Sequence, residues 1–138
     1  MKLNNDCMRE VLIYLETCDY YTSDSSGDVT SNPVYLDTIS DNFPQYKKHE
    51  LFYVLKNLDQ AGLIFLSSWA AGDNTIDCAV ESISFNGHEF LNHIADEENW
   101  SIIKKGLASI RNYSLAAIEA VATGTAQGAV QGYLSSLA

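Results

Sequence analysis

The chain has 138 residues, of which 46% are hydrophobic and 11% aromatic. This composition suffices for one packed domain without metals or disulfides and is too apolar for a disordered chain. The formal net charge of −10 comes from 8 Lys and Arg against 18 Asp and Glu, whereas nucleic-acid-binding proteins usually carry an excess of positive charge. Positions 63–100 contain no Lys or Arg, so this stretch would repel a phosphate backbone.

The first predicted element is a helix that Asn4 or Asn5 caps. Residues 22–33 follow it and are rich in Ser, Asp, Gly and Thr, which predicts a polar, mobile loop. A short helix is then expected over residues 35–41, ending near Pro44. The apolar face of the first helix is expected to consist of Cys7, Val11, Tyr14, Leu15 and Cys18.

A second apolar stripe predicts a central helix over residues 47–61. Gly62 follows at the point where a helix commonly ends in a left-handed residue. The buried residues of this helix are expected to be Leu51, Leu55 and Leu58.

A β-hairpin is predicted after the central helix. Residues 63–69 and 76–85 are rich in β-branched and aromatic residues, and turn-forming residues separate them. The apolar alternation of the second strand changes phase, which predicts a bulge near Glu81. Asn86 and Glu89 have the spacing of a capping box and predict another helix.

The order helix, helix, helix, hairpin, helix is typical of a winged helix. The predicted fold class is therefore α+β, mainly α, with three helices and a β-hairpin followed by C-terminal helices. Residues 1–100 are expected to form the winged-helix-like domain, and residues 101–138 a helical tail that serves as a packing or dimerisation element.

The tail has a small residue at every fourth position, which on a helix forms one narrow stripe. Three interpretations stay open: a helix dimer, packing on the same chain, or a membrane segment. The stretch is too polar to favour a membrane segment, and the length of the stripe favours a homodimer slightly over intrachain packing. The stripe consists of Ala116, Ala120, Gly124, Gly128, Gly132 and Ser136.

Three sequence blocks resemble the domain-of-unknown-function 2513 family of short phage and bacterial proteins. They are MKLNNDCMREVLIYLE, HELFYVLKNLDQAGLI and SFNGHEFLNHIADEENW, in this order. The resemblance implies a winged-helix-like fold and a phage or prophage setting, and it implies no activity. The glycine-striped tail departs from the more basic tails of the family.

Catalytic motifs are not evident. His88, Glu89 and His93 approach the HExxH pattern, but the second His comes one residue too late for both rings to share a helix face. The acidic run at residues 96–98 is expected to be a solvated helix face, because consecutive helical residues point in different directions. We therefore predict no catalytic, cofactor or metal site, and a protein that is not an enzyme.

The cysteines also lack a motif. Cys7, Cys18 and Cys78 form no CxxC pair and are expected to be buried, reduced thiols. The polar N-terminus lacks the apolar core of a signal peptide. We therefore expect a protein of the bacterial cytoplasm.

The outward face of the central helix is the candidate recognition surface, since in a winged helix this helix enters the DNA major groove. It consists of Lys47, Lys48, His49, Tyr53, Lys56 and Gln60. The acidic hairpin opposes DNA binding. The favoured hypothesis is therefore binding to a host or phage protein, for example inhibition of a bacterial defence complex with a basic nucleic-acid channel. The alternative is a dimeric winged-helix transcriptional regulator that binds duplex DNA. The acidity itself is either functional, as in a DNA mimic, or a solubility feature.

Overall fold

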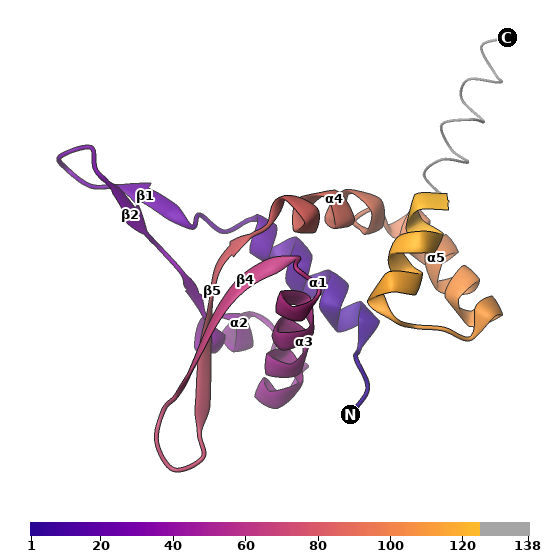
Figure 1. The fold of residues 1–138 in the computed structure, drawn as a ribbon, viewed down its shortest axis with the longest axis horizontal. Helices are drawn as coiled ribbons and strands as arrows, with labels where there is room; N and C mark the ends of the chain where they lie inside the picture. The colour runs from indigo at the N-terminus through magenta and orange to yellow at the C-terminus, as the bar shows by residue number, and fades with distance from the viewer. Residues whose placement is uncertain (125–138) are drawn as a thin grey trace, which may run out of the picture. The chain divides into compact units, whose positions relative to one another are not determined.

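A computed structural model describes residues 1–124, which form a mainly helical α+β fold as predicted (Figure 1). The chain divides into two units, Met1–His88 and Glu89–Ala138. Helix α4 (Phe85–Ile94) crosses this boundary, and the second unit adds α5 (Glu97–Ile110) and a helix that is described over residues 115–124. The first unit contains, in chain order, α1 (Asn5–Glu16), β1 (Tyr21–Ser23), β2 (Val29–Ser31), β3 (Val34–Tyr35), α2 (Leu36–Asn42), α3 (Lys48–Gln60), β4 (Ile64–Ala70) and β5 (Ile76–Ile83).

Helix α1 begins at the predicted cap. The Oδ1 atom of Asn4 accepts a hydrogen bond from the backbone N–H of Cys7 at 3.0 Å. The predicted apolar face is wrong at its end, because the helix stops at the Thr17 cap and Cys18 lies beyond it, half-buried. The fully buried residues of α1 are Cys7, Met8, Val11, Leu12 and Leu15.

Helix α3 confirms the predicted central helix. Its first turn is closed by a hydrogen bond from the backbone N–H of Lys47 to the Glu50 carboxylate, at 3.2 Å. Gly62 follows the helix with a φ of 77°, the left-handed conformation expected of it. The buried residues of α3 are Leu51, Val54, Leu55 and Leu58.

The main sheet is antiparallel, with strand order β3-β5-β4. Phe65 pairs with Ser82, whereas Leu66 pairs with Val80, so Glu81 is the extra residue of a bulge. The bulge therefore lies where the change of phase in the sequence predicted it.

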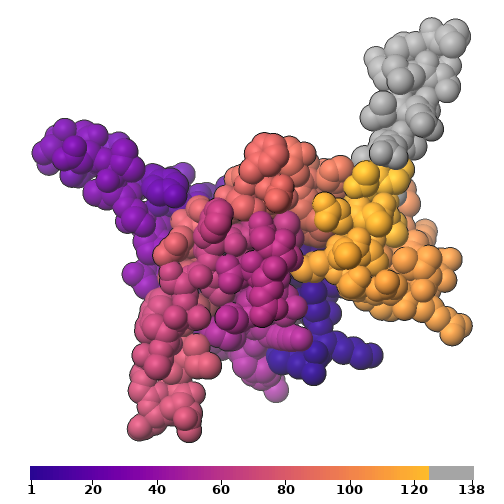
Figure 2. All heavy atoms as spheres, viewed as in Figure 1, coloured from indigo at the N-terminus to yellow at the C-terminus, as the bar shows by residue number. Residues whose placement is uncertain are grey.

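The predicted loop at residues 22–33 is wrong in part, because β1 and β2 pair there as a second hairpin. The hydroxyls of Thr22 and Thr30 lie 2.7 Å apart across the pair, and the Asp24 carboxylate accepts the backbone N–H groups of Ser26 and Asp28 in the turn. Every residue of both strands is exposed. This hairpin and the β4–β5 hairpin project from the first unit as two separate arms (Figures 1 and 2).

The predicted capping residue of α4 is also wrong. The helix begins at Phe85, and the Ser84 hydroxyl accepts a hydrogen bond from the backbone N–H of Gly87 at 2.9 Å. The same hydroxyl donates to the carbonyl of Gly62 at 2.6 Å. Ser84 rather than Asn86 therefore caps α4, and it also ties the helix to the end of α3.

We expect Ser84→Ala to lower the free energy of unfolding by about 1–2 kcal/mol, because it removes both the helix cap and the hydrogen bond to the Gly62 carbonyl. Asn86→Ala, at an exposed position in the first turn, should change it by less than about 0.5 kcal/mol. Urea denaturation of the two variants measures both effects. A larger loss of stability in Asn86→Ala than in Ser84→Ala would show that Asn86 is the cap.

The second unit has its own buried residues. The Asp96 carboxylate caps α5 by accepting the backbone N–H of Asn99 at 2.9 Å. The predicted domain boundary at residue 100 lies inside this unit, since the division falls within α4. Within the described residues, none of the helices is long and apolar enough to span a bilayer. The buried side chains of the unit include Phe90, Leu91, Ile94, Trp100, Ile103, Leu107, Ala117, Ile118 and Ala122.

The small-residue stripe is described only in its first half. Ala116, Ala120 and Gly124 are exposed, on the side of the helix away from its buried residues. Gly128, Gly132 and Ser136 lie outside the described residues. Among residues 1–124, no side chain buries this half of the stripe, and the predicted homodimer stays a prediction.

Candidate functional site

The candidate recognition surface lies on α3, as its sequence pattern required. Lys47, Lys48, His49 and Gln60 are exposed, whereas Tyr53 and Lys56 are half-buried. The surroundings of these side chains decide whether they form a basic surface.

Lys48 forms an ion pair with α2. Its Nζ atom lies 2.5 Å from the Oδ1 atom of Asp37, and both side chains are largely exposed. The hydrogen bond to Asp37 and the charge of that carboxylate raise the pKa of Lys48, and Asp77 and Asp41 raise it further. Lys48 is thus held in its charged form, but several carboxylates already compensate its charge.

Lys56 is half-buried, and its charge acts on the sheet. Its positive charge lowers the pKa of the Cys78 thiol on β5, although burial and the charge of Asp77 raise that pKa to about 11 overall. Lys56 is therefore less accessible than the exposed Lys47 and Lys48.

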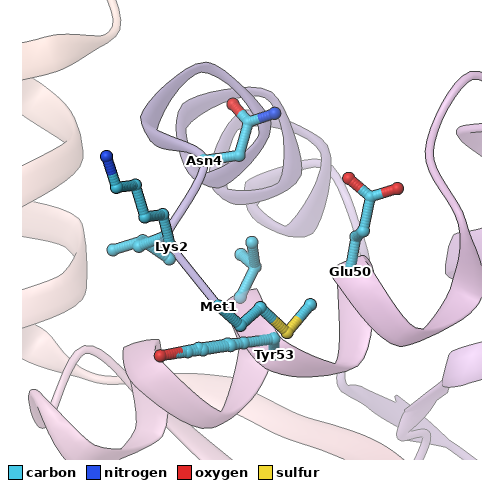
Figure 3. A pocket seen from close by; sticks show the side chains of 7 residues that line it. Met1, Lys2, Asn4, Glu50 and Tyr53 are labelled. Atoms are coloured by element: carbon cyan, nitrogen blue, oxygen red, sulfur yellow. The ribbon is translucent and has the colours of Figure 1, made fainter.

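Tyr53 lines a pocket with the N-terminal segment. The pocket has a volume of about 250 Å³, and Figure 3 shows Met1 alongside the Tyr53 ring, with Lys2 and Glu50 at the rim. Tyr53 is therefore flanked by the chain's own N-terminus. The residues that line this pocket are Met1, Lys2, Leu3, Asn4, Glu50, Tyr53 and Val54.

His49 lines a second, larger hollow on the other side of α3. This hollow has a volume of about 440 Å³ and involves α2, α3 and the tip of the β4–β5 hairpin. Its lining residues are Leu36, Lys48, His49, Phe52, Asn74 and Ile76. Five of the six predicted recognition residues therefore lie on α3 and Lys47 is its N-cap, but the six do not form one basic surface.

The sequence analysis missed an aromatic surface on the outer face of the main sheet. The rings of Tyr35 and Trp69 meet edge to face, with centroids 6.3 Å apart and planes at 82°. Tyr35 is 49% exposed, Trp69 40% and Phe65 56%. The alternation of Phe65, Ser67 and Trp69 along one strand is a sequence signal for part of this surface.

Two carboxylates accompany these aromatic side chains. Asp77 pairs with Trp69 in the register of the sheet, and Glu81 is the bulged residue of the same strand. The Oε1 atom of Glu81 lies 2.5 Å from the Ser67 hydroxyl. The sequences of β3, β4 and β5 contain no Lys or Arg, so this surface is acidic as well as aromatic.

The histidines and carboxylates considered for catalysis do not converge. The Nδ1 atom of His88 lies 3.3 Å from the Oε2 atom of Glu16, an exposed pair on the first unit. Asp96 serves as a helix cap. Among residues 1–124, no group of three or more His, Cys, Asp or Glu side chains is placed to hold a metal ion.

Two of the cysteines are buried as predicted, and all three are free. Cys7 and Cys78 are fully buried. Burial, with the charges of Glu10 and Glu50, raises the pKa of the Cys7 thiol to about 12. Cys18 is half-buried, and its Sγ atom donates to the carbonyl of Tyr14 at 3.5 Å.

Comparison with known proteins gives one match. Residues 2–113 match a family described as hypothetical protein (DUF2513). No curated protein and no solved structure matches the chain.

Proposed function

The chain belongs to the DUF2513 family, and we propose that it acts without catalysis, by binding a basic surface of another protein. The observation that carries this proposal is the pairing of Lys48 with Asp37 at the start of α3, within the field of Asp77 and Asp41. Carboxylates of neighbouring elements therefore surround Lys48 at the start of the helix that would enter a DNA groove.

The order of the helices and strands supports the interpretation of this protein as a binding module. The order of α1, α2, α3 and the β4–β5 hairpin, with β3 joined to the sheet, is consistent with the winged helix that we propose. In a DNA-binding winged helix, the hairpin approaches the phosphate backbone. Here the hairpin and its turn contain Asp73, Asp77 and Glu81 and no Lys or Arg, so a phosphate backbone would be repelled and a basic protein attracted.

The partner in this proposal is a protein of the bacterial host, in whose cytoplasm a phage or prophage product would act. One form of the proposal is inhibition of a defence complex whose nucleic-acid channel is basic. The phage setting rests on the family resemblance, and the choice of a basic partner rests on the charges described above.

The second candidate function is a dimeric DNA-binding regulator. The position of α3 in the winged-helix order favours it, as do the exposed Lys47 at the start of the helix and the exposed small-residue stripe over residues 116–124. A titration of labelled random duplex DNA at low salt separates the two functions.

We expect no binding of duplex DNA by the intact chain at protein concentrations up to about 10 µM, because too few uncompensated cations face outward. Fluorescence anisotropy at 50 mM salt measures this. Salt-sensitive binding that Lys48→Glu and Lys56→Glu abolish would overturn the proposal in favour of the regulator. Lys105→Glu makes the same charge change at an exposed position of α5 and is the matched control.

A further inference from the structure

The outer face of the β3-β5-β4 sheet combines exposed aromatic rings with carboxylates and has no basic residue. We propose that this face docks an arginine-bearing segment of a partner protein. The inference rests on the proposed function, because it identifies the surface and the partner chemistry through which a basic protein would be bound.

The register of the sheet brings the aromatic side chains together. Paired residues of antiparallel strands point to the same face, so Tyr35, Ala79 and Ser67 form one row across the three strands. The small side chain of Ala79, which is only 4% exposed, lies between two strands whose rings meet over β5. Tyr35 and Trp69 therefore form one aromatic surface.

Phe65 extends this surface along β4. It lies two strand positions before Ser67 and four before Trp69, and therefore on the same face. Three large aromatic side chains at 40–56% exposure on one sheet face are unusual for a surface that stays in water. Tyr and Trp are also the side chains most enriched at the energetic centres of protein interfaces.

The charges on this face select the partner. Asp77 and Glu81 are the carboxylates of β5, and each keeps an acceptor oxygen after its hydrogen bond to Cys78 N–H or to Ser67. A guanidinium group can stack on an aromatic ring while it donates to a carboxylate. A planar arginine satisfies both contacts better than the compact ammonium of lysine.

Other occupants fit the same face less well. A nucleic acid would bring phosphate against Asp77 and Glu81. A second copy of the chain, with its net charge of −10, would bring further carboxylates. Charge complementarity therefore favours a basic protein segment.

The test is a titration of the full chain with a labelled oligo-arginine peptide, at 150 mM salt, followed by fluorescence anisotropy. We expect binding that Asp77→Asn with Glu81→Gln weakens by about tenfold, since both charge-assisted contacts are lost. Amide side chains retain the acceptor oxygens for Cys78 N–H and Ser67, so the sheet is preserved. Trp69→Ala should weaken binding by a similar factor.

The matched control is Glu97→Gln with Glu98→Gln, which removes the same charge from exposed positions of α5. It should change the affinity by less than about twofold, because both carboxylates of the sheet face remain and only the net charge of the chain changes. An oligo-lysine peptide of equal length should bind more weakly than oligo-arginine. Peptide binding should also change the emission of the exposed Trp69 far more than that of Trp100, which is 5% exposed.

The outcomes separate this inference from the proposed function. Equal binding of oligo-arginine by the wild type, the sheet variants and the control would overturn the sheet as the docking face while basic-surface binding stands. Self-association that Trp69→Ala removes would instead make the face an interface between copies and overturn the inference. Absence of peptide binding together with tight DNA binding would overturn both.

Discussion

Replacing Gly87 with alanine should lower the free energy of unfolding by about 3 kcal/mol or more, the range of severe overpacking. A Cβ atom at this position would clash with the carbonyl oxygen of Leu63. It would also lie 3.0 Å from the Leu63 carbonyl carbon and 2.7 Å from Cγ2 of Ile83. Two of these three atoms belong to the backbone, which cannot move aside as the end of a side chain can. The first turn of α4 therefore requires glycine.

The neighbouring hydrogen bonds explain why the strain cannot relax locally. The Leu63 carbonyl accepts the backbone N–H of Ser84 at 3.0 Å, and the Ser84 hydroxyl donates to Gly62. The same hydroxyl accepts the N–H of Gly87. Moving α4 away from Leu63 would stretch this network, so a methyl group at residue 87 disturbs the end of α3, the start of β4 and the start of α4 together.

The matched control is Gly106→Ala, the same substitution in a helix. There the new Cβ would lie 2.9 Å from Cγ1 of Val121, a side-chain atom rather than backbone, and the higher helix propensity of alanine offsets the contact. We expect a change within about 1 kcal/mol. Urea denaturation followed by circular dichroism measures both variants. Equal stability of Gly87→Ala and the wild type would show that α4 does not begin against Leu63.

Helical periodicity and end signals were enough to predict α1 and α3. Asn4 and Gly62 lie at the ends that their chemistry requires, and the buried leucines of α3 follow the spacing of one helix face. The β4–β5 hairpin and its bulge were also predictable, because the change of phase at Glu81 is visible in the alternation of apolar residues. These features depend on residues close together in the sequence.

The predictions for residues 22–33 and for the cap of α4 were wrong because nearby residues carry competing sequence signals. The β1–β2 hairpin has few apolar residues, since Thr22 and Thr30 pair through hydroxyls and Asp24 closes the turn, so its composition indicated a loop. At α4, Asn86 and Glu89 have capping-box spacing, but Ser84 has both the hydroxyl and the nearby Gly62 carbonyl. The sequence alone gave no reason to prefer Ser84.

The site was only partly predictable for a different reason. The outward residues of α3 follow from helix geometry, but the pairing of Lys48 with Asp37 depends on how α2 and α3 pack. Likewise, the alternation of Phe65 and Trp69 is readable along β4, whereas the contact of Trp69 with Tyr35 requires the pairing of β3 with β5. Contacts between elements decide the charge and the apolar character of both surfaces.

The second large effect concerns alkaline pH, where we expect the free energy of unfolding to fall steeply between pH 9 and 11. Burial raises the pKa of Cys7 to about 12 and that of Cys78 to about 11, from an ordinary value of 9.0. Burial also raises the pKa values of Tyr20 and Tyr46, whose hydroxyls donate at 2.7 Å to the Leu15 carbonyl and to the Glu10 carboxylate. All four groups are thus kept neutral by the fold.

The direction of this change in the free energy of unfolding follows from proton linkage. Below pH 9 the thiols are protonated in both states, and their contribution to stability is fully present. As the pH rises toward 11 and 12, the unfolded chain releases these protons and the folded chain does not, so unfolding becomes more favourable. Each thiol should lower the free energy of unfolding by about 1.4 kcal/mol per pH unit in this window. The tyrosines add to the loss above about pH 10.

Urea denaturation at a series of pH values from 7 to 11 measures this loss. Cys7→Ala should be less stable than the wild type at pH 7, because a buried side chain is shortened, yet its stability should fall less steeply above pH 9, because one titrating group is gone. Cys18→Ala, at the half-buried position beyond α1, is the control for the removal of a thiol. If Cys7→Ala kept the full wild-type slope, ionisation of the Cys7 thiol would not be a source of alkaline unfolding. The loss would then have to come from the tyrosines, from Cys78 or from the growing negative charge of an already acidic chain.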